Sequence, residues 1–221
     1  MKSSNSRSSS CSIKKLLKNI IKILSVSSLL VFSINASANV IENGSFESPQ
    51  IQSQTWRVFS SIDGWQTISG AGIEIQNDLL VKAQDGHQYV ELDSHNNSAM
   101  TQELNDLDVG AWYNLSFWYR ARTNNGGNDN GISVHWDDKI LGDLALDVSD
   151  VLAKDGGWVE YTQSLRATAE TMFLSFAAIG KNNSLGGFID NVSVTAVSEP
   201  GLAHLLGLGV LGLVFTRRRT R

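Results

Sequence analysis

Residues 112–120, WYNLSFWYR, constrain the fold most strongly, because large apolar side chains alternate there with mostly polar ones. In an extended chain, successive side chains point to opposite faces. One face would comprise Tyr113, Leu115, Phe117 and Tyr119. The other would comprise Asn114, Ser116, Trp118 and Arg120. This period of two predicts a β-strand with one face in a hydrophobic core.

Similar short runs recur along residues 39–197, separated by turn-rich pieces such as TNNGGNDNG and KNNSLGG. They read GIEIQ, QYVELD, ISVHW, WVEYTQSL, MFLSFAAIG and GFIDNVSVTA. No convincing helical period with caps occurs between them. The spacing predicts one all-β domain over residues 39–197, most simply a jelly-roll β-sandwich, because an open sheet of this size would leave long edges exposed.

The N-terminus has the order of a secretory signal peptide. Four lysines precede an apolar segment at 23–34, and Ala-Ser-Ala follows at 36–38. The lysines are Lys14, Lys15, Lys18 and Lys22. We therefore expect residues 1–38 to be removed on export; because the basic leader is long, an uncleaved anchor is the alternative. The only cysteine, Cys11, would leave with them, so the mature chain would contain no disulfide.

The C-terminus combines an apolar stretch with a basic end. Residues 201–215 are expected to form a single transmembrane helix of about 22 Å, which is short for a permanent membrane anchor of about 30 Å. The alternative, a buried amphipathic core helix, fits poorly with an apolar run that has no polar stripe. Arginines follow at 217, 218, 219 and 221. The positive-inside rule keeps such a cluster in the cytoplasm, which places the preceding domain outside it.

Residues 198–221 resemble the bacterial PEP-CTERM sorting signal, in which a short motif, an apolar helix and an arginine cluster follow in that order. The motif here is Ser198, Glu199 and Pro200, with serine in place of the usual first proline. The resemblance implies an exosortase as partner and an inner-membrane intermediate. Cleavage would then deliver the domain to the cell surface or the extracellular polysaccharide matrix.

The charge of the central segment differs from that of the whole chain. Residues 39–199 contain 22 acidic and eight basic residues, a formal charge of −14. Such a charge repels nucleic acid and anionic lipid. It is compatible with an exported protein that binds cations or neutral glycans.

Three motifs, NVIENGSFE, DGHQYVELDS and GGFIDNVSV, together resemble galactose-binding-like jelly rolls, which include many carbohydrate-binding modules. The likeness extends over most of residues 39–196. It is strongest to a branch shared by plant cell-wall proteins and bacterial exported proteins. The resemblance implies a non-catalytic, glycan-associated module.

Asp190 is the first candidate metal ligand, because the period of two places it on the face of Val192 and Val194, which looks like the core face. In related modules a structural calcium occupies this region. The matching positions are Glu47 and Asp190, with a carbonyl of Ser45. An alternative is that Asp190 accepts hydrogen bonds from a turn, helped by a slipped strand register.

Trp118, Arg120 and Asn114 are the candidate sugar ligands, because an aromatic plane beside fixed polar groups is the common chemistry of sugar recognition. The alternative for Trp118 is packing under a loop or into a second sheet.

Glu91 and Asp93 form a candidate catalytic pair of a glycan-degrading enzyme. Two residues apart on a strand, they would lie about 7 Å from each other, within the roughly 6.5–9.5 Å of inverting glycosidases. Parallel side chains cannot flank a sugar from opposite sides, so a solvated strand face is the favoured interpretation. We expect no enzyme; a purely structural surface protein without a sugar ligand is a further alternative.

Overall fold

The computed structural model describes residues 38–122, 130–148 and 156–197, which belong to one compact unit. Every regular element in these ranges is a β-strand. The strands are β1 (Trp56–Phe59), β2 (Ser61–Ile62), β3 (Trp65–Ser69), β4 (Ile73–Asn77), β5 (Gln88–Glu91), β6 (Ala99–Leu104), β7 (Trp112–Arg120), β8 (Ile132–Asp137), β9 (Leu144–Val148), β10 (Val159–Arg166), β11 (Met172–Ala178) and β12 (Phe188–Ala196). The all-β class is confirmed.

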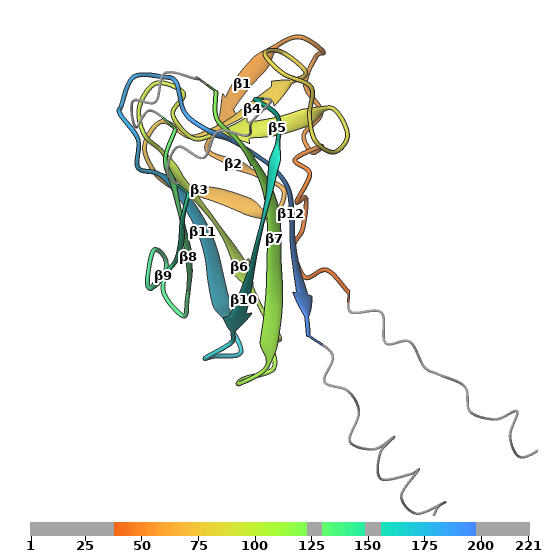
Figure 1. Ribbon diagram of the computed structural model, residues 1–221, viewed down its shortest axis with the longest axis vertical. Helices are drawn as coiled ribbons and strands as arrows, with labels where there is room; N and C mark the ends of the chain where they lie inside the picture. The colour runs from red at the N-terminus through yellow and green to blue at the C-terminus, as the bar shows by residue number, and fades with distance from the viewer. Residues whose placement is uncertain (1–37, 123–129, 149–155, 198–221) are drawn as a thin grey trace, which may run out of the picture. The chain divides into compact units, whose positions relative to one another are not determined.

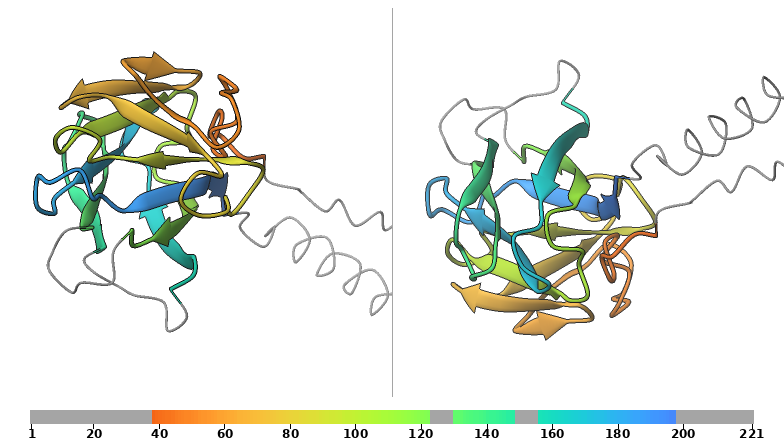
Figure 2. Two further views of the ribbon diagram at one scale, coloured as in Figure 1. Left: turned by 90° about the horizontal axis from the view of Figure 1, so that it is seen from above. Right: turned by 90° about the horizontal axis from the view of Figure 1, so that it is seen from below.

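The strands form two six-stranded sheets. The first has the order β1-β4-β5-β12-β7-β10 and the second the order β2-β3-β6-β11-β8-β9, and the pairings are antiparallel. In Figure 1, β8, β9 and β11 lie to the left of β7 and β12, and Figure 2 shows the layers from above and below. This two-layer arrangement is that of a jelly-roll-like sandwich.

The core lies between the sheets and contains the predicted apolar face of β7. Tyr113, Leu115, Phe117 and Tyr119 are buried. Phe117 stacks on Tyr161 and meets Phe176 of the other sheet edge to face, with ring centroids 5.5 and 5.2 Å apart. The buried cluster is drawn entirely from residues 41–194, so the domain holds a complete core of its own.

The two ends of the domain lie side by side. Asn39 forms an isolated antiparallel bridge with Thr195, and the Val40 N–H donates to the Val194 carbonyl at 2.9 Å. The start of the described chain therefore pairs with β12, as the jelly-roll hypothesis requires.

A β-bulge in β12 changes which face Asp190 occupies. Asp190 lies opposite Trp118 and Ser193 opposite Ser116, so two residues of β12 stand opposite one residue of β7 and one extra residue is inserted. Asn191 has a positive φ of 48°, which allows this local kink. The prediction that Asp190 shares the core face with Val192 is wrong. Asp190 lies on the outer face, opposite Trp118, whereas Val192 and Val194 lie in the core.

Candidate functional site

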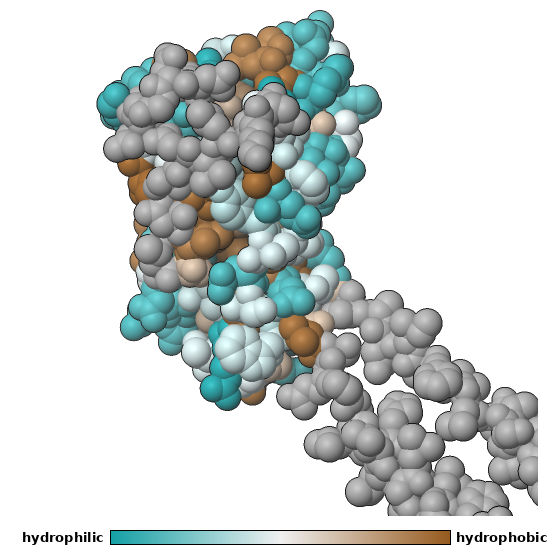
Figure 3. Space-filling view, viewed as in Figure 1, coloured by the Kyte–Doolittle hydropathy of each residue, from teal (hydrophilic) through white to brown (hydrophobic). Residues whose placement is uncertain are grey.

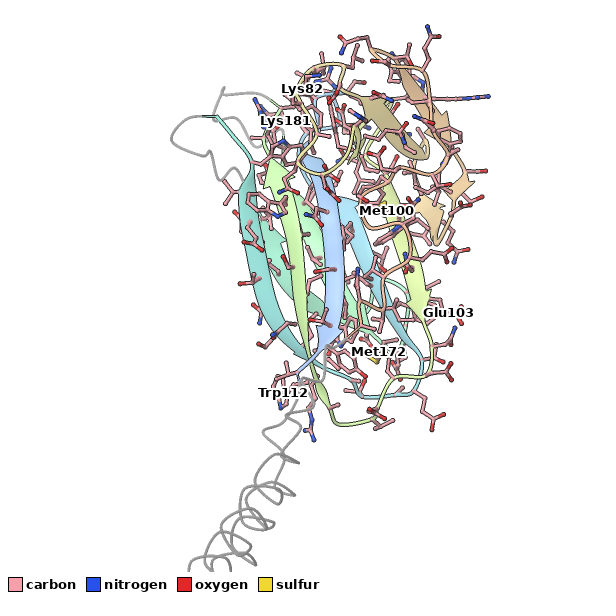
Figure 4. All side chains as sticks on the ribbon, turned by 90° about the vertical axis from the view of Figure 1, so that its right-hand side faces the viewer. Lys82, Met100, Glu103, Trp112, Met172 and Lys181 are labelled. Carbon is pink, nitrogen blue, oxygen red and sulfur yellow. The ribbon has the colours of Figure 1, made fainter. Side chains whose placement is uncertain are left out.

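The outer face of β7 and its neighbours forms a groove lined by hydroxyl and amide groups. Antiparallel registers place β10 and β12 on either side of β7. The residues that line this groove, which we call the polar groove, are Asn114, Leu115, Ser116, Thr162, Gln163, Ser164, Ser193 and Thr195. The Leu115 side chain is buried in the core, so this residue lines the groove with its main chain. The cavity volume is about 340 Å³. In Figure 4, β10, β7 and β12 lie next to one another across this face.

Several hydroxyl groups in the polar groove are available to a ligand. Ser116 donates to Glu160 at 2.8 Å, and Ser164 donates to Asn114 at 3.1 Å. Within the described ranges, the hydroxyls of Thr162, Ser193 and Thr195 make no such side-chain bond. Hydroxyls of this kind can donate to and accept from a ligand.

Two tryptophans flank the groove-lining residues of β7 along the strand. Trp118 and Arg120 continue the outer face of β7 at one end, and both are partly exposed. Trp112 begins β7 at the other end, is 51% exposed, and lies at the lower end of the strand in Figure 4. The two tryptophans are six positions apart on the strand, which separates their Cα atoms by about 20 Å. The three predicted sugar ligands thus lie on one face of one strand, pointing away from the second sheet.

The upper half of the same face is closed. Tyr89 and Phe188 are fully buried there, with ring centroids 4.9 Å apart, and Trp158 meets Tyr89 edge to face at 5.8 Å. The Trp158 indole N–H also donates to the Lys82 carbonyl at 2.8 Å. This packing lies beside Arg120, which pairs with Phe188, so the open part of the face runs along β7 from Trp118 down to Trp112. On the side shown in Figure 3, apolar residues form separate patches among polar ones.

Asp190 holds the connection between β4 and β5. Its Oδ2 accepts from the N–H groups of Gln84 and Asp85 at 2.7 and 2.9 Å, and its Oδ1 accepts from the Asn191 N–H at 2.7 Å. The alternative of a turn hydrogen-bonded to Asp190 with a shifted register is confirmed. Burial raises the pKa of this carboxyl to about 7, although the three N–H groups act in the opposite direction.

Glu47 holds the same connection at its other end. Its Oε1 accepts from the N–H groups of His87 and Gln88 at 2.6 and 2.7 Å. Ser45 lies in the adjoining turn, one residue before Phe46, whose N–H donates to the Asn43 carbonyl. Glu47 and Asp190 therefore both act as acceptors for the segment 78–88, and a calcium ion shared between them stays a prediction. In the described part of the chain, no three His, Cys, Asp or Glu residues gather as metal ligands.

Glu91 and Asp93 do not lie on a solvated strand face; both are fully buried. Arg122 Nη1 contacts the two Glu91 oxygens at 2.6 and 2.7 Å, and Gln76 Nε2 bridges Glu91 to Glu74 at 2.7 and 2.8 Å. The interpretation as a solvated face is wrong because the segments 78–87 and 181–186 bond over this part of the sheet.

Burial raises the pKa of Glu91 to about 8, and the neighbouring Glu74 charge acts in the same direction. Arg122 and the Gly186 N–H, which donates at 2.9 Å, oppose this shift. The Glu91 carboxyl therefore belongs to an interior hydrogen-bond network. Because its side chain has no exposed surface, a polysaccharide bound to the domain would not contact it.

Sequence reasoning missed much of the polar groove. Thr162, Ser164, Ser193 and Thr195 come from strands whose register on β7 requires long-range pairing. The alternation of 159–166 was a usable signal, because Glu160, Thr162 and Ser164 share its polar face.

The predicted terminal signals lie outside the described residues. They are the sorting residues Ser198, Glu199 and Pro200, the helix 201–215 and nearly all of the signal peptide. Within the described ranges, no helix has the length and apolarity needed to cross a bilayer.

An antiparallel β-sandwich with a solvent-open polar groove on one sheet is the class of protein that this fold and site define. The chain belongs to the family described as "Protein of unknown function (DUF642)", whose family model matches residues 39–195. A curated relative is the multifunctional-autoprocessing repeats-in-toxin of Vibrio vulnificus, 28% identical over 163 residues. The match covers 73% of this chain and 3% of the toxin, so the chain spans a small part of that relative's length.

Solved structures share the fold. The Stig cyclase Fisc from Fischerella sp. TAU has a TM-score of 0.53 at 16% identity, covering 73% of this chain and 98% of the cyclase. The K1 cleaved adhesin domain of Lys-gingipain from Porphyromonas gingivalis W83 has a TM-score of 0.50 at 16% identity, covering 65% and 98%. TmCBM61, solved with β-1,4-galactotriose, has a TM-score of 0.45 at 17% identity, covering 73% and 100%. The likenesses to the cyclase and to the adhesin domain, with TM-scores of 0.53 and 0.50, show the fold alone.

Proposed function

We propose that residues 38–197 form an exported, non-catalytic glycan-binding module with the polar groove as its sugar site. The observation that supports this most is the solvent-open groove lined mainly by residues with hydroxyl and amide groups, with the partly exposed Trp112 and Trp118 on either side of it along β7. Indole planes cover the apolar C–H faces of sugars, and hydroxyl and amide groups bind sugar hydroxyls. The length of the face suits an oligosaccharide segment within an extracellular polysaccharide.

The charge of the domain narrows the ligand class. The formal charge of −14 over residues 39–199 disfavours polyanionic glycans. Arg120 adds one cation at the upper end of the groove, and Glu160 adds one anion beside Ser116. A neutral polysaccharide therefore suits this surface best.

We expect residues 38–197 to be retained on at least one neutral polysaccharide in a binding panel. Trp118→Ala should weaken that binding about tenfold, equivalent to about 1.4 kcal/mol, because the ring would lose its stacking surface. Trp56→Ala is the matched control, since Trp56 is 48% exposed on β1 at the opposite edge of the same sheet. Isothermal titration calorimetry would give both affinities.

Two outcomes would contradict the glycan proposal. No retention on any polysaccharide would favour a structural surface protein without a sugar ligand. Release of reducing ends, lost in Glu91→Gln, would favour a glycan-degrading enzyme. No observation on the described residues favours that second candidate over binding.

We also propose export and sorting of the chain by an exosortase, which rests on the sequence of the two termini. Removal of the tail near Glu199 would lower the mass by roughly two kilodaltons and eliminate a C-terminal epitope tag. Intact-mass measurement of the protein from a host that has an exosortase would detect this change. Finding only tagged, full-length protein in the membrane fraction would instead support an ordinary anchor.

A further inference from the structure

Two loops at the upper end of the first sheet are joined through two side chains. The loop 92–98 follows β5 and is closed by the Ser98 N–H, which donates to the Leu92 carbonyl at 2.7 Å. The loop 180–186 precedes β12; its Lys181 is labelled at the upper end in Figure 4. Asp93 and Asn97 of the first loop both reach the second.

Each of these side chains binds the second loop with one atom only. Asp93 Oδ2 accepts from the N–H groups of Asn183 and Leu185 at 3.0 and 3.3 Å. Asn97 Nδ2 donates to the Gly180 carbonyl at 2.8 Å. The remaining oxygen of each side chain is therefore held close to the boundary between the two loops.

These remaining oxygens are buried and lack a hydrogen-bond partner. They are Asp93 Oδ1 and Asn97 Oδ1, together with Ser94 Oγ of the same loop. Asp93 is 0% and Ser94 7% exposed. The described ranges contain five such atoms, of which three belong to this short loop. Buried polar atoms are normally partnered, so a concentration of unpartnered oxygens points to a ligand.

The chemistry of the three oxygens favours a hard cation. A carboxylate, an amide oxygen and a hydroxyl are oxygen ligands that calcium accepts, with main-chain carbonyls and water completing six to eight positions. A water molecule would supply hydrogen bonds but no charge to offset the buried Asp93 carboxylate. The nearby guanidinium of Arg122 is already bonded to Glu91 and to the Ser184 carbonyl.

We propose that the loops 92–98 and 180–186 form a calcium site with Asp93, Ser94 and Asn97 as side-chain ligands. The site is distinct from the predicted pair of Glu47 and Asp190, and it does not depend on glycan binding. Because it has one carboxylate, its affinity should lie in the weak range of extracellular modules, with a Kd of about 10⁻⁴–10⁻³ M. Calcium would fix both loops over the closed half of the first sheet.

The test is the calcium dependence of the melting temperature of residues 38–197. Calcium at about 10 mM should raise the Tm of chelator-treated protein by about 3–10 °C, because the ion binds only the folded state. Asp93→Asn should abolish this rise, since its amide retains the loop bond but loses the charge. Without calcium, Asp93→Asn should melt no lower than the wild type. Ser94→Ala, a second variant, should reduce the rise.

Glu47→Gln is the matched control, because it removes a carboxylate from the other predicted calcium pair and keeps the acceptor oxygen. It should retain the full rise. A rise lost in Glu47→Gln and kept in Asp93→Asn would overturn the proposal in favour of the Glu47 and Asp190 pair. No rise in the wild type would show that the Asp93 charge is balanced within the protein, which also overturns it.

Discussion

Arg122→Leu is expected to lower the free energy of unfolding by about 3 kcal/mol at pH 9, near the lower end for broken buried ion pairs. Glu91 is fully buried, and Arg122 Nη1 binds its two carboxylate oxygens at 2.6 and 2.7 Å as the cationic partner among the residues that the structure describes. The Arg122 side chain keeps 25% of its exposure, which moderates the loss. Urea unfolding followed by tryptophan fluorescence would measure it.

The loss should depend on pH. Burial raises the pKa of Glu91 from 4.5 to about 8, so its contribution to stability is fully present below pH 4.5 and declines as the pH rises through 8. At pH 6 the folded protein keeps the proton on Glu91. The variant then leaves a neutral acid rather than a buried charge, and its loss should be clearly smaller.

Arg57→Leu is the control for the Arg122 experiment. Arg57 is exposed and lies over the Phe59 ring at 5.4 Å, an arrangement worth about 0.5–1 kcal/mol. Equal losses for Arg122→Leu at pH 6 and pH 9 would contradict the assignment of its effect to the Glu91 charge.

Asp190→Ala is expected to lower the free energy of unfolding by about 3 kcal/mol, because three N–H groups lose their acceptor in one step. The loss should be local to the segment 78–88. Hydrogen exchange of the Gln84 and Asp85 amides should accelerate more than exchange in β7. Asp190→Asn keeps one acceptor oxygen and should lose about half as much.

A different result would count against this role of Asp190. If Asp190→Ala left the exchange of Gln84 and Asp85 unchanged, the connection would be held by other contacts. Glu47 is the obvious candidate, since it accepts from the N–H groups of His87 and Gln88 in the same segment.

The alternation of residues 112–120 was sufficient to predict β7 and both of its faces, because a period of two is a local property. It also brought Asn114, Trp118 and Arg120 to one surface. The position of Asp190 was not predictable in the same way. The bulge depends on a positive φ at Asn191, and asparagine permits that conformation without requiring it.

The buried network around Glu91 escaped sequence reasoning for another reason. Its partners Gln76, Arg122 and Gly186 lie 15, 31 and 95 residues away, and no local pattern connects them. Glu91 also looks like a surface residue by type, since carboxylates are rarely fully buried unless paired. The buried environment of Glu91 depends on Arg122, which lies just after β7 at the start of a turn-rich segment.

The central claim is that the polar groove binds a glycan, and amide chemical-shift mapping tests it most directly. The titrant is a fragment of the polysaccharide retained in the binding panel. The account predicts that shifts gather in residues 114–120, 159–164 and 193–196. A smaller depression on the second sheet, of about 290 Å³, is lined by Ile62, Gly64, Trp65, Gln66, Thr101 and Glu103. Shifts confined to that depression, or no shifts with any glycan, would contradict the claim.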